Sequence, residues 1–400
     1  MKPLDSNQVV ISGEKILFSV SQKTIFIFSI CLMIISCTGK PFKKVEDDLV
    51  KVLSFQYHVV DADGVHNPWA KMIADINGDG ALDIIIGGQK GPLVWYKNPE
   101  WEKFDIADGG YDTVDGEAGD IDGDGDMDIV MGGLFWYENP GRSQVTTETS
   151  WTAHKIADHA THDVELADIN KDGSLDVITR NQSEFGTEKG NTIHVWVNRG
   201  NGKWDEDILE CEHGEGLKVI DLEGDGDKDV IGSGFWFENL GNEDWKKHHI
   251  TAWHASANLA VADVNGDNRK DIVLTPSELG GQYYKISWFE QPEEISSGRW
   301  KEHYLVDSIE CVIHGVGVGD FNGDNAMDVA YSEMHQGQDP DEVVVLINLD
   351  YGTSWGKIIL SEKGSHSIEV ADINGDGNPD ILGANWSGDY QPVEIWFSRK

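Results

Sequence analysis

The stretch ADINGDGALDIIIGG, residues 74–88, places an acidic, glycine-containing loop directly before an apolar run. The loop follows the pattern D-x-N-x-D-x-x-x-D, so side-chain oxygens stand at its first, third, fifth and ninth positions. The apolar run is short and ends in glycines, which is typical of a buried strand. The stretch therefore predicts an oxygen-rich loop that leads into the interior of a β-sheet.

This loop recurs along the chain, and seven copies at a period of roughly 50 residues indicate a repeat architecture. The copies begin at Asp75, Asp120, Asp168, Asp221, Asp263, Asp320 and Asp372. Each copy would be one supersecondary unit that buries its apolar face only against its neighbours.

Each repeat contains four short strand patterns, typified by LKVI, IVMGG, FWYENP and WKKHHI. Four short strands per repeat of this length are typical of one blade of a β-propeller. The chain ends in VEIWFSRK, the third strand of the seventh blade, while FQYHVV at residues 55–60 precedes the first blade. We therefore predict an all-β, seven-bladed propeller whose last blade is closed by an N-terminal strand at about residues 54–60, which removes an exposed sheet edge.

The N-terminal part has the features of an export signal. An apolar run, TIFIFSICLMIIS at residues 24–36, is followed by Cys37. The run has signal-peptide length, and its end resembles a bacterial lipoprotein box in which Cys37 carries the lipid. An uncleaved anchor is the alternative. We expect a signal peptide at 1–36, a lipidated tether at 37–53 and a propeller at 54–400, in a protein anchored by lipid at the bacterial outer membrane or cell surface.

The charge of the chain excludes one class of partner. Its 71 acidic and 31 basic residues give a formal net charge of -40. Nucleic-acid binding needs a basic surface for the phosphate backbone, and the sequence offers none. We therefore expect no nucleic-acid partner, and contact with a membrane through the lipid alone.

Oxygen ligands at alternating loop positions suit Ca²⁺, which accepts six to eight oxygens in flexible geometry. The seven loops resemble those of the FG-GAP and VCBS repeat family, the propeller type also found in integrin α chains, over residues 55–400. The resemblance implies seven blades with calcium between the first and second strands of each. The ligands that it implies are Asp75, Asn77, Asp79, Asp83, Asp120, Asp122, Asp124, Asp128, Asp168, Asn170, Asp172, Asp176, Asp221, Glu223, Asp225, Asp229, Asp263, Asn265, Asp267, Asp271, Asp320, Asn322, Asp324, Asp328, Asp372, Asn374, Asp376 and Asp380.

A second set of candidates precedes the innermost strands. Strand geometry places these segments on the face opposite the acidic loops, near the axis. Half of the 14 histidines fall in these short windows: His66, His159, His162, His213, His254, His314 and His366. Convergence of these imidazoles predicts a transition-metal site for Zn²⁺, Mn²⁺ or Fe²⁺, an acid–base site, or both. Individually, each histidine could instead cap a strand.

Two functions fit this pattern. The first is an envelope carbohydrate-processing enzyme, a lyase or dehydratase, in which the metal polarises a carbonyl of an oxidised sugar. Tyr111 or His335 would carry the proton and Arg180 would clamp an anion. The second is a non-catalytic module that binds glycans or a protein partner on the same face, with Trp386 stacking on sugar rings.

Removal of calcium is expected to destabilise the protein, because clustered carboxylates repel one another without a cation. One site saturated at 100 times its dissociation constant contributes about 2.7 kcal/mol to stability. Thermal unfolding followed by tryptophan fluorescence should show a lower midpoint in excess EGTA, and added calcium should restore it. An unchanged midpoint after verified calcium removal would contradict the predicted calcium loops.

Overall fold

The computed structural model describes residues 53–111, 115–141, 151–159, 161–181, 191–241, 244–254, 256–277, 279–296 and 298–400. The predicted signal peptide, Cys37 and the predicted tether up to residue 52 lie outside the described residues. Within the described part of the chain there are strands and turns but no helix. Accordingly, no helix found there is long and apolar enough to cross a membrane.

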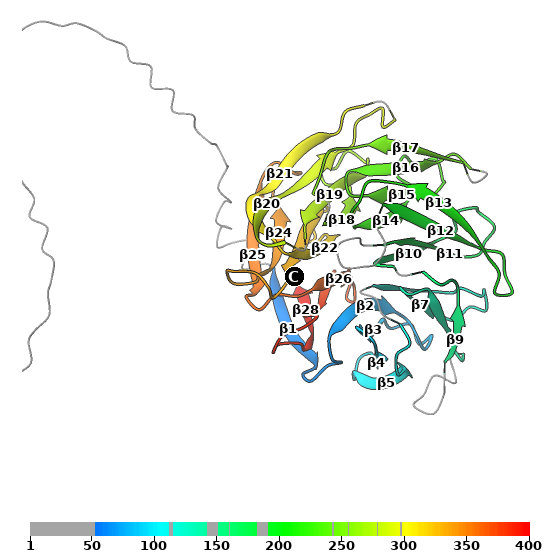
Figure 1. Ribbon diagram of the computed structural model, residues 1–400. Helices are drawn as coiled ribbons and strands as arrows, with labels where there is room; N and C mark the ends of the chain where they lie inside the picture. Colours follow the sequence, from blue (N-terminus) through cyan, green and yellow to red (C-terminus); the bar gives the residue numbers. More distant parts are fainter. Residues whose placement is uncertain are drawn as a thin grey trace, which may run out of the picture. The chain divides into compact units, whose positions relative to one another are not determined.

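Seven four-stranded antiparallel sheets form a ring, which confirms the predicted seven-bladed β-propeller (Figure 1). In the first six sheets the strands follow chain order from the axis outward, and in the seventh the outermost strand is β1, from the other end of the described chain. Contacts between neighbouring innermost strands run from β2 through β6, β10, β14, β18, β22 and β26 back to β2, so the ring is closed.

The first four blades are built from the following strands: β2 (Pro68–Ala74), β3 (Asp83–Gly88), β4 (Leu93–Lys97) and β5 (Glu102–Ala107); β6 (Gly116–Gly119), β7 (Asp128–Met131), β8 (Phe135–Glu138) and β9 (Thr152–Lys155); β10 (Asp163–Ala167), β11 (Asp176–Arg180), β12 (Thr192–Asn198) and β13 (Trp204–Glu210); β14 (Leu217–Ile220), β15 (Asp229–Gly232), β16 (Phe235–Asn239) and β17 (Trp245–His249). The last three blades are built from these: β18 (Ala257–Ala262), β19 (Asp271–Pro276), β20 (Leu279–Glu290) and β21 (Lys301–Cys311); β22 (Ile313–Gly319), β23 (Asp328–Glu333), β24 (Val343–Asn348) and β25 (Trp355–Ser361); β26 (Ser367–Ala371), β27 (Asp380–Ala384), β28 (Val393–Arg399) and β1 (Ser54–Asp61).

The two ends of the propeller chain share the seventh blade, as predicted. Strand β1 pairs antiparallel with β28, from Ser54 opposite Arg399 to Asp61 opposite Val393. Leu53, the last residue of the predicted tether, is already buried in the cluster that joins blades six and seven. Leu53 thus already contributes to the core, and β1 covers the edge that β28 would otherwise expose.

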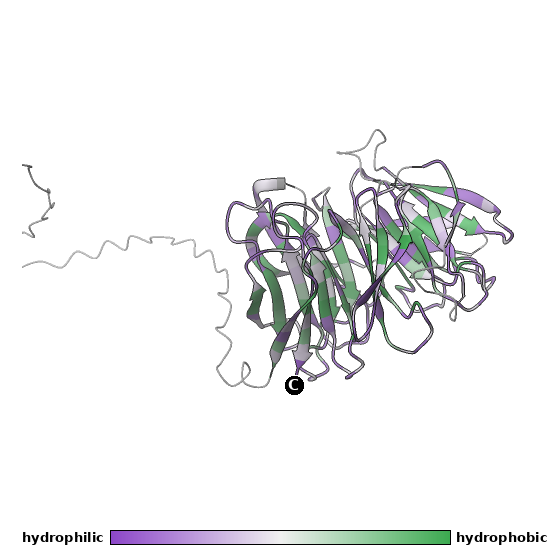
Figure 2. Ribbon diagram, turned by 90° about the horizontal axis from the view of Figure 1, so that it is seen from below, coloured by the Kyte–Doolittle hydropathy of each residue, from purple (hydrophilic) through white to green (hydrophobic). Residues whose placement is uncertain are grey.

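The core consists of seven hydrophobic clusters, one at each junction between neighbouring blades. Figure 2 shows apolar residues along the strands and hydrophilic residues in the loops at their ends. The second strands, such as β3, are buried along their whole length. Because both faces of these strands pack on other blades, their sequences are continuous apolar runs rather than alternating ones.

The ninth residue of every acidic loop is a buried aspartate that begins the second strand. In blade one, the two carboxylate oxygens of Asp83 accept hydrogen bonds from the backbone N–H groups of Ile76, at 3.1 Å, and Asn98, at 2.9 Å. The equivalent pair of bonds is present in the other six blades. This carboxylate therefore fastens the loop and the end of the third strand to the start of the second.

A side-chain amide at the end of the third strand then links each blade to the preceding one. The Asn98 amide donates to the carbonyl of Ile373 in blade seven at 2.7 Å. Five further amides make the same contact with the preceding blade: Asn139, Asn198, Asn239, Gln291 and Asn348. Blade seven has Ser398 at this position. At that junction the ring of Phe55 packs against Phe321 of blade six, with centroids 5.9 Å apart.

Two loops have asparagine in place of glycine at position six and keep the same backbone conformation there. Gly80, at position six of the first loop, has φ 89°. Asn268 and Asn325 replace this glycine in blades five and six and have φ 64° and 67°. Asparagine tolerates the left-handed region better than most residues, so the replacements preserve the turn.

The Asn348→Ala variant tests the link between blades. The side chain donates to the carbonyls of Val264 and Met327 and accepts from the N–H of Gly352. Because it leaves these buried groups without their partner, we expect the change to lower the free energy of unfolding by about 1–3 kcal/mol. Urea denaturation measures this, with the exposed-site variant Glu362→Ala as control. Equal midpoints for the two variants would show that the amide adds nothing to stability.

Candidate functional site

The starts of three innermost strands bring ionisable side chains together at one mouth of the axis. His162 directly precedes β10, His366 directly precedes β26, and His314 is the second residue of β22. Glu215 lies in the short segment before β14. All four side chains are buried. This face is opposite the acidic loops, which follow the other ends of the same strands.

The cluster of His162, Glu215 and His314, called here the His–Glu cluster, has the geometry of a metal site. One ligand atom from each residue lies within 4.8 Å of the others. His162 Nε2 is 3.7 Å from Glu215 Oε2, and the rings of His162 and His314 are 5.4 Å apart between centroids. The ring of His366 stacks on that of His314 at 4.3 Å. Two imidazoles and a carboxylate could hold zinc, manganese or iron.

Burial keeps the imidazoles of His314 and His366 in the neutral form, which is the form that binds metal. Desolvation, reinforced by the neighbouring His162, lowers the pKa of His314 to about 3. Desolvation, with contributions from His314 and Lys71, also lowers the pKa of His366 well below its usual value. Protonated imidazoles would repel one another here.

A supporting shell orients the cluster. His162 Nδ1 lies 3.1 Å from Asp163 Oδ1, and the other Asp163 oxygen accepts from the N–H of Gly216 at 3.1 Å. Burial raises the pKa of Asp163, but His162 and Arg180 outweigh this and leave the pKa lowered, so the carboxylate stays ionised. An outer carboxylate that fixes a ligating imidazole is a common feature of metal centres.

Arg180 and Ser277 hold the Glu215 segment in place. The guanidinium of Arg180 is buried and donates to the carbonyls of Glu212, Glu215 and Gly216, each at 2.9 Å. The hydroxyl of Ser277 donates to Glu215 Oε1. These contacts favour a structural role for Arg180 over the anion clamp that we predicted from the sequence.

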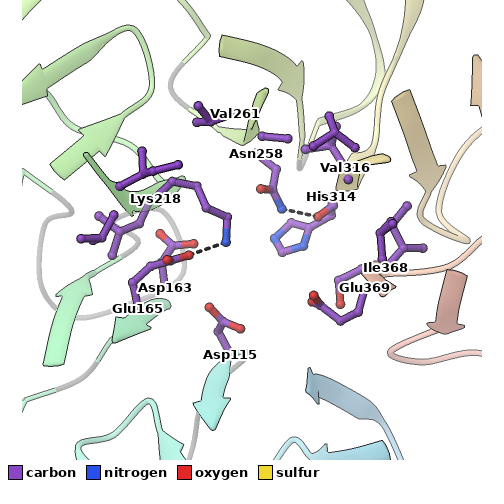
Figure 3. A pocket seen from close by; sticks show the side chains of 18 of the residues that line it. Asp115, Asp163, Glu165, Lys218, Asn258, Val261, His314, Val316, Ile368 and Glu369 are labelled. Carbon is purple, nitrogen blue, oxygen red and sulfur yellow. Dashed lines mark hydrogen bonds and ion pairs between the residues drawn. The ribbon is translucent and has the colours of Figure 1, made fainter. Parts of the chain in front are cut away.

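An axial cavity of about 300 Å³ adjoins the His–Glu cluster and is lined by His162 and His314. Figure 3 shows the remaining charged side chains that point into it, which are Asp115, Asp163, Glu165, Lys218 and Glu369. Lys218 forms an ion pair with Glu165. Burial is the main cause that raises the pKa of Asp115 to about 6 and that of Glu369 to about 7.

Four of the predicted rim histidines do not join the cluster. His66 and His213 are exposed. His254 Nδ1 lies 2.9 Å from the carbonyl oxygen of Ser256. The ring of His159 lies 4.1 Å from that of His194 on a third strand. These four lie two or more residues before the strand in their blade, whereas the three that converge lie within one residue of its start or inside it.

The two predicted proton carriers occupy different environments. Tyr111 is buried in the hydrophobic cluster between blades one and two, and burial raises its pKa, which favours a packing role. His335 lies near the ring of Trp386, with centroids 5.6 Å apart, and its Nε2 is 2.9 Å from the hydroxyl of Ser387. Burial lowers the pKa of His335.

Sequence reasoning missed the acidic half of the site. Glu215 stands two residues after His213 in HGEGLKVI, and Asp163 stands next to His162 in HDVELA. Glu369 and Lys218 interrupt innermost strands that are otherwise mostly apolar. A charged residue within an apolar innermost strand was the available signal, because such a side chain must face the axis.

The acidic loops form a second group of candidates on the other face. In blades two and four, oxygens of the first, third and ninth loop residues lie within 4.8 Å of one another: Asp120, Asp122 and Asp128, and Asp221, Glu223 and Asp229. Burial raises the pKa of the ninth residue, to about 7 for Asp128, although two backbone N–H groups oppose the shift. The oxygen-only donor set fits Ca²⁺.

Comparison with known proteins agrees with the repeat and the fold. The FG-GAP-like repeat family matches residues 75–131 and 320–383, which span four of the seven loops. A chain in the crystal structure of BBS1N in complex with ARL6DN, soaked with mercury, is 10% identical to this protein with a TM-score of 0.51, and the match covers 87% of this protein and 96% of the matched chain. A chain in the same complex soaked with lead is 10% identical with a TM-score of 0.55, and that match covers 86% of this protein and 97% of the matched chain. These likenesses concern the fold alone, and the comparison with curated proteins gives no match. Two segments of this seven-bladed propeller, in blades one and two and in blades six and seven, are therefore FG-GAP-like repeats.

Proposed function

We propose that this propeller is a metal-dependent carbohydrate-processing protein of the bacterial cell envelope, anchored by lipid on Cys37. The observation that carries the proposal is the convergence of His162, Glu215 and His314 beside an axial cavity. Ionisable side chains with shifted pKa values in a concave site favour a functional role over a purely structural one. The cavity offers room for part of a sugar-sized substrate.

The proposed reaction is elimination or dehydration of an oxidised sugar. A bound metal ion would supply a Lewis acid that polarises the sugar carbonyl. Glu369 lines the cavity, and its pKa of about 7 suits removal of the proton next to that carbonyl. The leaving group then departs with the proton that Glu369 has taken up, so that the step needs no second acid. Asp163 and Arg180 keep His162 and Glu215 in position throughout.

We also propose that the acidic loops bind calcium and serve stability rather than chemistry. Their convergent oxygens in blades two and four support this role. They lie at the ends of the innermost strands that point away from the His–Glu cluster. Binding there would brace the corner between the first and second strands of a blade.

The second candidate is a non-catalytic module that binds glycans on the same face. The partly exposed ring of Trp386 near His366 favours it, because indole rings stack on sugars. Metal content separates the two functions. A transition metal at the His–Glu cluster supports the enzyme, and calcium alone supports the binding module.

Metal binding by variants of the His–Glu cluster tests the main proposal. We expect elemental analysis of the purified protein to show zinc, manganese or iron beyond calcium. His162→Ala and Glu215→Gln should each lower the affinity for this metal by more than about 100-fold, since loss of even an outer-shell partner costs about 10–100-fold. His213→Ala, in an exposed neighbouring position, is the matched control and should retain the metal.

Turnover is measured as new ultraviolet absorbance from unsaturated products in a screen of oxidised sugars and polysaccharides. Activity that requires the metal and disappears in His162→Ala supports the enzyme. Absence of any transition metal from the wild-type protein, after growth with these metals supplied, would remove the proposal.

Arg180 gives a separate test of how the site is assembled. Arg180→Met keeps the aliphatic bulk but removes the donors to three buried carbonyls, so we expect it to lower the free energy of unfolding by about 2–4 kcal/mol. Arg199→Met, on the protein surface, should change the free energy of unfolding by less than about 0.5 kcal/mol. If Arg180→Met instead unfolds like the wild type, Arg180 is not structural and the anion-clamp role regains support.

A further inference from the structure

An aromatic rim borders the His–Glu cluster at blades one, six and seven. Trp386 lies in the loop between β27 and β28, and its ring meets that of Trp69 edge to face, with centroids 5.5 Å apart. Trp386 is partly exposed, so one part of its ring system remains open to a ligand. His335 adds a third ring, 5.6 Å from Trp386.

This rim is connected to the proposed metal ligands by direct ring contacts. The ring of Trp386 lies 6.2 Å from that of His366, which in turn lies 4.3 Å from that of His314. The ring of Trp386 is therefore linked to that of His314 through one intervening ring, that of His366.

The rim is held rigid by hydrogen bonds that do not involve a ligand. Trp386 Nε1 donates to Gln336 Oε1 at 3.3 Å, and His335 Nε2 lies 2.9 Å from the hydroxyl of Ser387. A platform that is already ordered loses little conformational entropy when a ligand binds. This favours a recognition surface over a loosely packed loop.

Polar atoms of the same rim remain unsatisfied. Trp69 Nε1, His335 Nδ1 and Asn385 Oδ1 are buried, and none has a hydrogen-bond partner among the described residues. Asn385 is only 2% exposed, and its amide nitrogen is already used by the carbonyls of Lys363 and Gly364. Buried polar atoms normally have partners, so this group favours a ligand that brings both donors and acceptors. A hydroxyl-bearing sugar ring does so, and it also has an apolar face for the indole.

The charge of the adjoining cavity indicates which sugars can enter. Its lining carries four carboxylates, on Asp115, Asp163, Glu165 and Glu369, against one ammonium group, that of Lys218. Lys218 is already paired with Glu165, and the guanidinium of Arg180 is occupied by carbonyls. The whole chain carries a formal charge of -40. A uronate or sulfated sugar would meet repulsion at both short and long range.

We propose that Trp386, Trp69 and His335 form a subsite for an uncharged pyranose ring, which presents the adjoining sugar unit to the His–Glu cluster. The inference rests on the proposed carbohydrate function and narrows its substrate class to neutral sugars and their keto derivatives. Trp386 stacks on the apolar face of the ring, and Trp69 and His335 hydrogen-bond to its hydroxyls.

The test is to measure the binding of defined oligosaccharides to the purified full-length protein by calorimetry and by tryptophan fluorescence. The probes are cellotetraose, maltotetraose, mannotetraose and xylotetraose, with tetragalacturonate as the anionic comparison. At least one neutral probe should bind more tightly than tetragalacturonate. Trp386→Ala should raise the dissociation constant of that probe by about 10-fold or more, which corresponds to the usual binding free energy of one aromatic contact. Trp386→Phe should recover part of it.

Tyr304→Ala, which removes an exposed aromatic ring from the outermost strand of blade five, is the matched control and should bind as the wild type does. Tighter binding of tetragalacturonate, no binding of any neutral probe, or equal affinity in Trp386→Ala with an unchanged melting temperature would each overturn the subsite. Metal content of the same samples separates the two proposals. If the protein contains the metal but binds no sugar, only the proposed subsite is contradicted. If it binds sugar through Trp386 but contains no transition metal, only the proposed metal centre is contradicted.

Discussion

One buried carboxylate in each blade is the interaction on which the rest of the structure depends. The ninth loop residue, Asp83 in blade one, is inaccessible to solvent and accepts one N–H from its own loop and one from the end of the third strand. A buried carboxylate without such partners would cost several kcal/mol. The same residue begins the second strand, so these bonds set where the loop ends and how the second and third strands align.

The repeat of this bond explains why seven separate sheets act as one ring. The third-strand residue whose N–H reaches the aspartate, Asn98 in blade one, also carries the side-chain amide that binds the preceding blade. One residue thereby connects the pairing of the second and third strands in its own blade to the backbone of the neighbouring blade. Among the described residues, blade seven has no such amide and carries Ser398 at that position. Its junction with blade six is completed by Leu53 and Phe55 from the N-terminal end of the described chain. The same N-terminal segment therefore completes the sheet of blade seven through β1 and packs blade seven against blade six.

The position of each strand start explains why some histidines meet and others do not. Innermost strands of a propeller converge on the axis, so a side chain within one residue of the start of such a strand lies close to its counterparts from other blades. His162, His314 and His366 satisfy this condition. His66 lies two residues before β2 and His213 four residues before β14, and both are exposed. The His–Glu cluster thus draws on blades three, four and six, and His366 of blade seven stacks on it. The buried Arg180 fixes the segment of Glu215, and Asp163 fixes the ring of His162.

The sequence by itself determined the repeat, the seven blades, the N-terminal closing strand and the buried second strands. Each of these follows from a local pattern of turn residues, apolar runs and carboxylates that recurs in every unit. It also indicated which face would carry the histidines, because strand direction alternates regularly. Only the tertiary structure decided which residues of that face come together, since Glu215 joins His162 and His314 across segments far apart in the chain. It likewise assigned Arg180 to backbone carbonyls, because burial and the partners of a guanidinium depend on three-dimensional packing that no repeat pattern encodes.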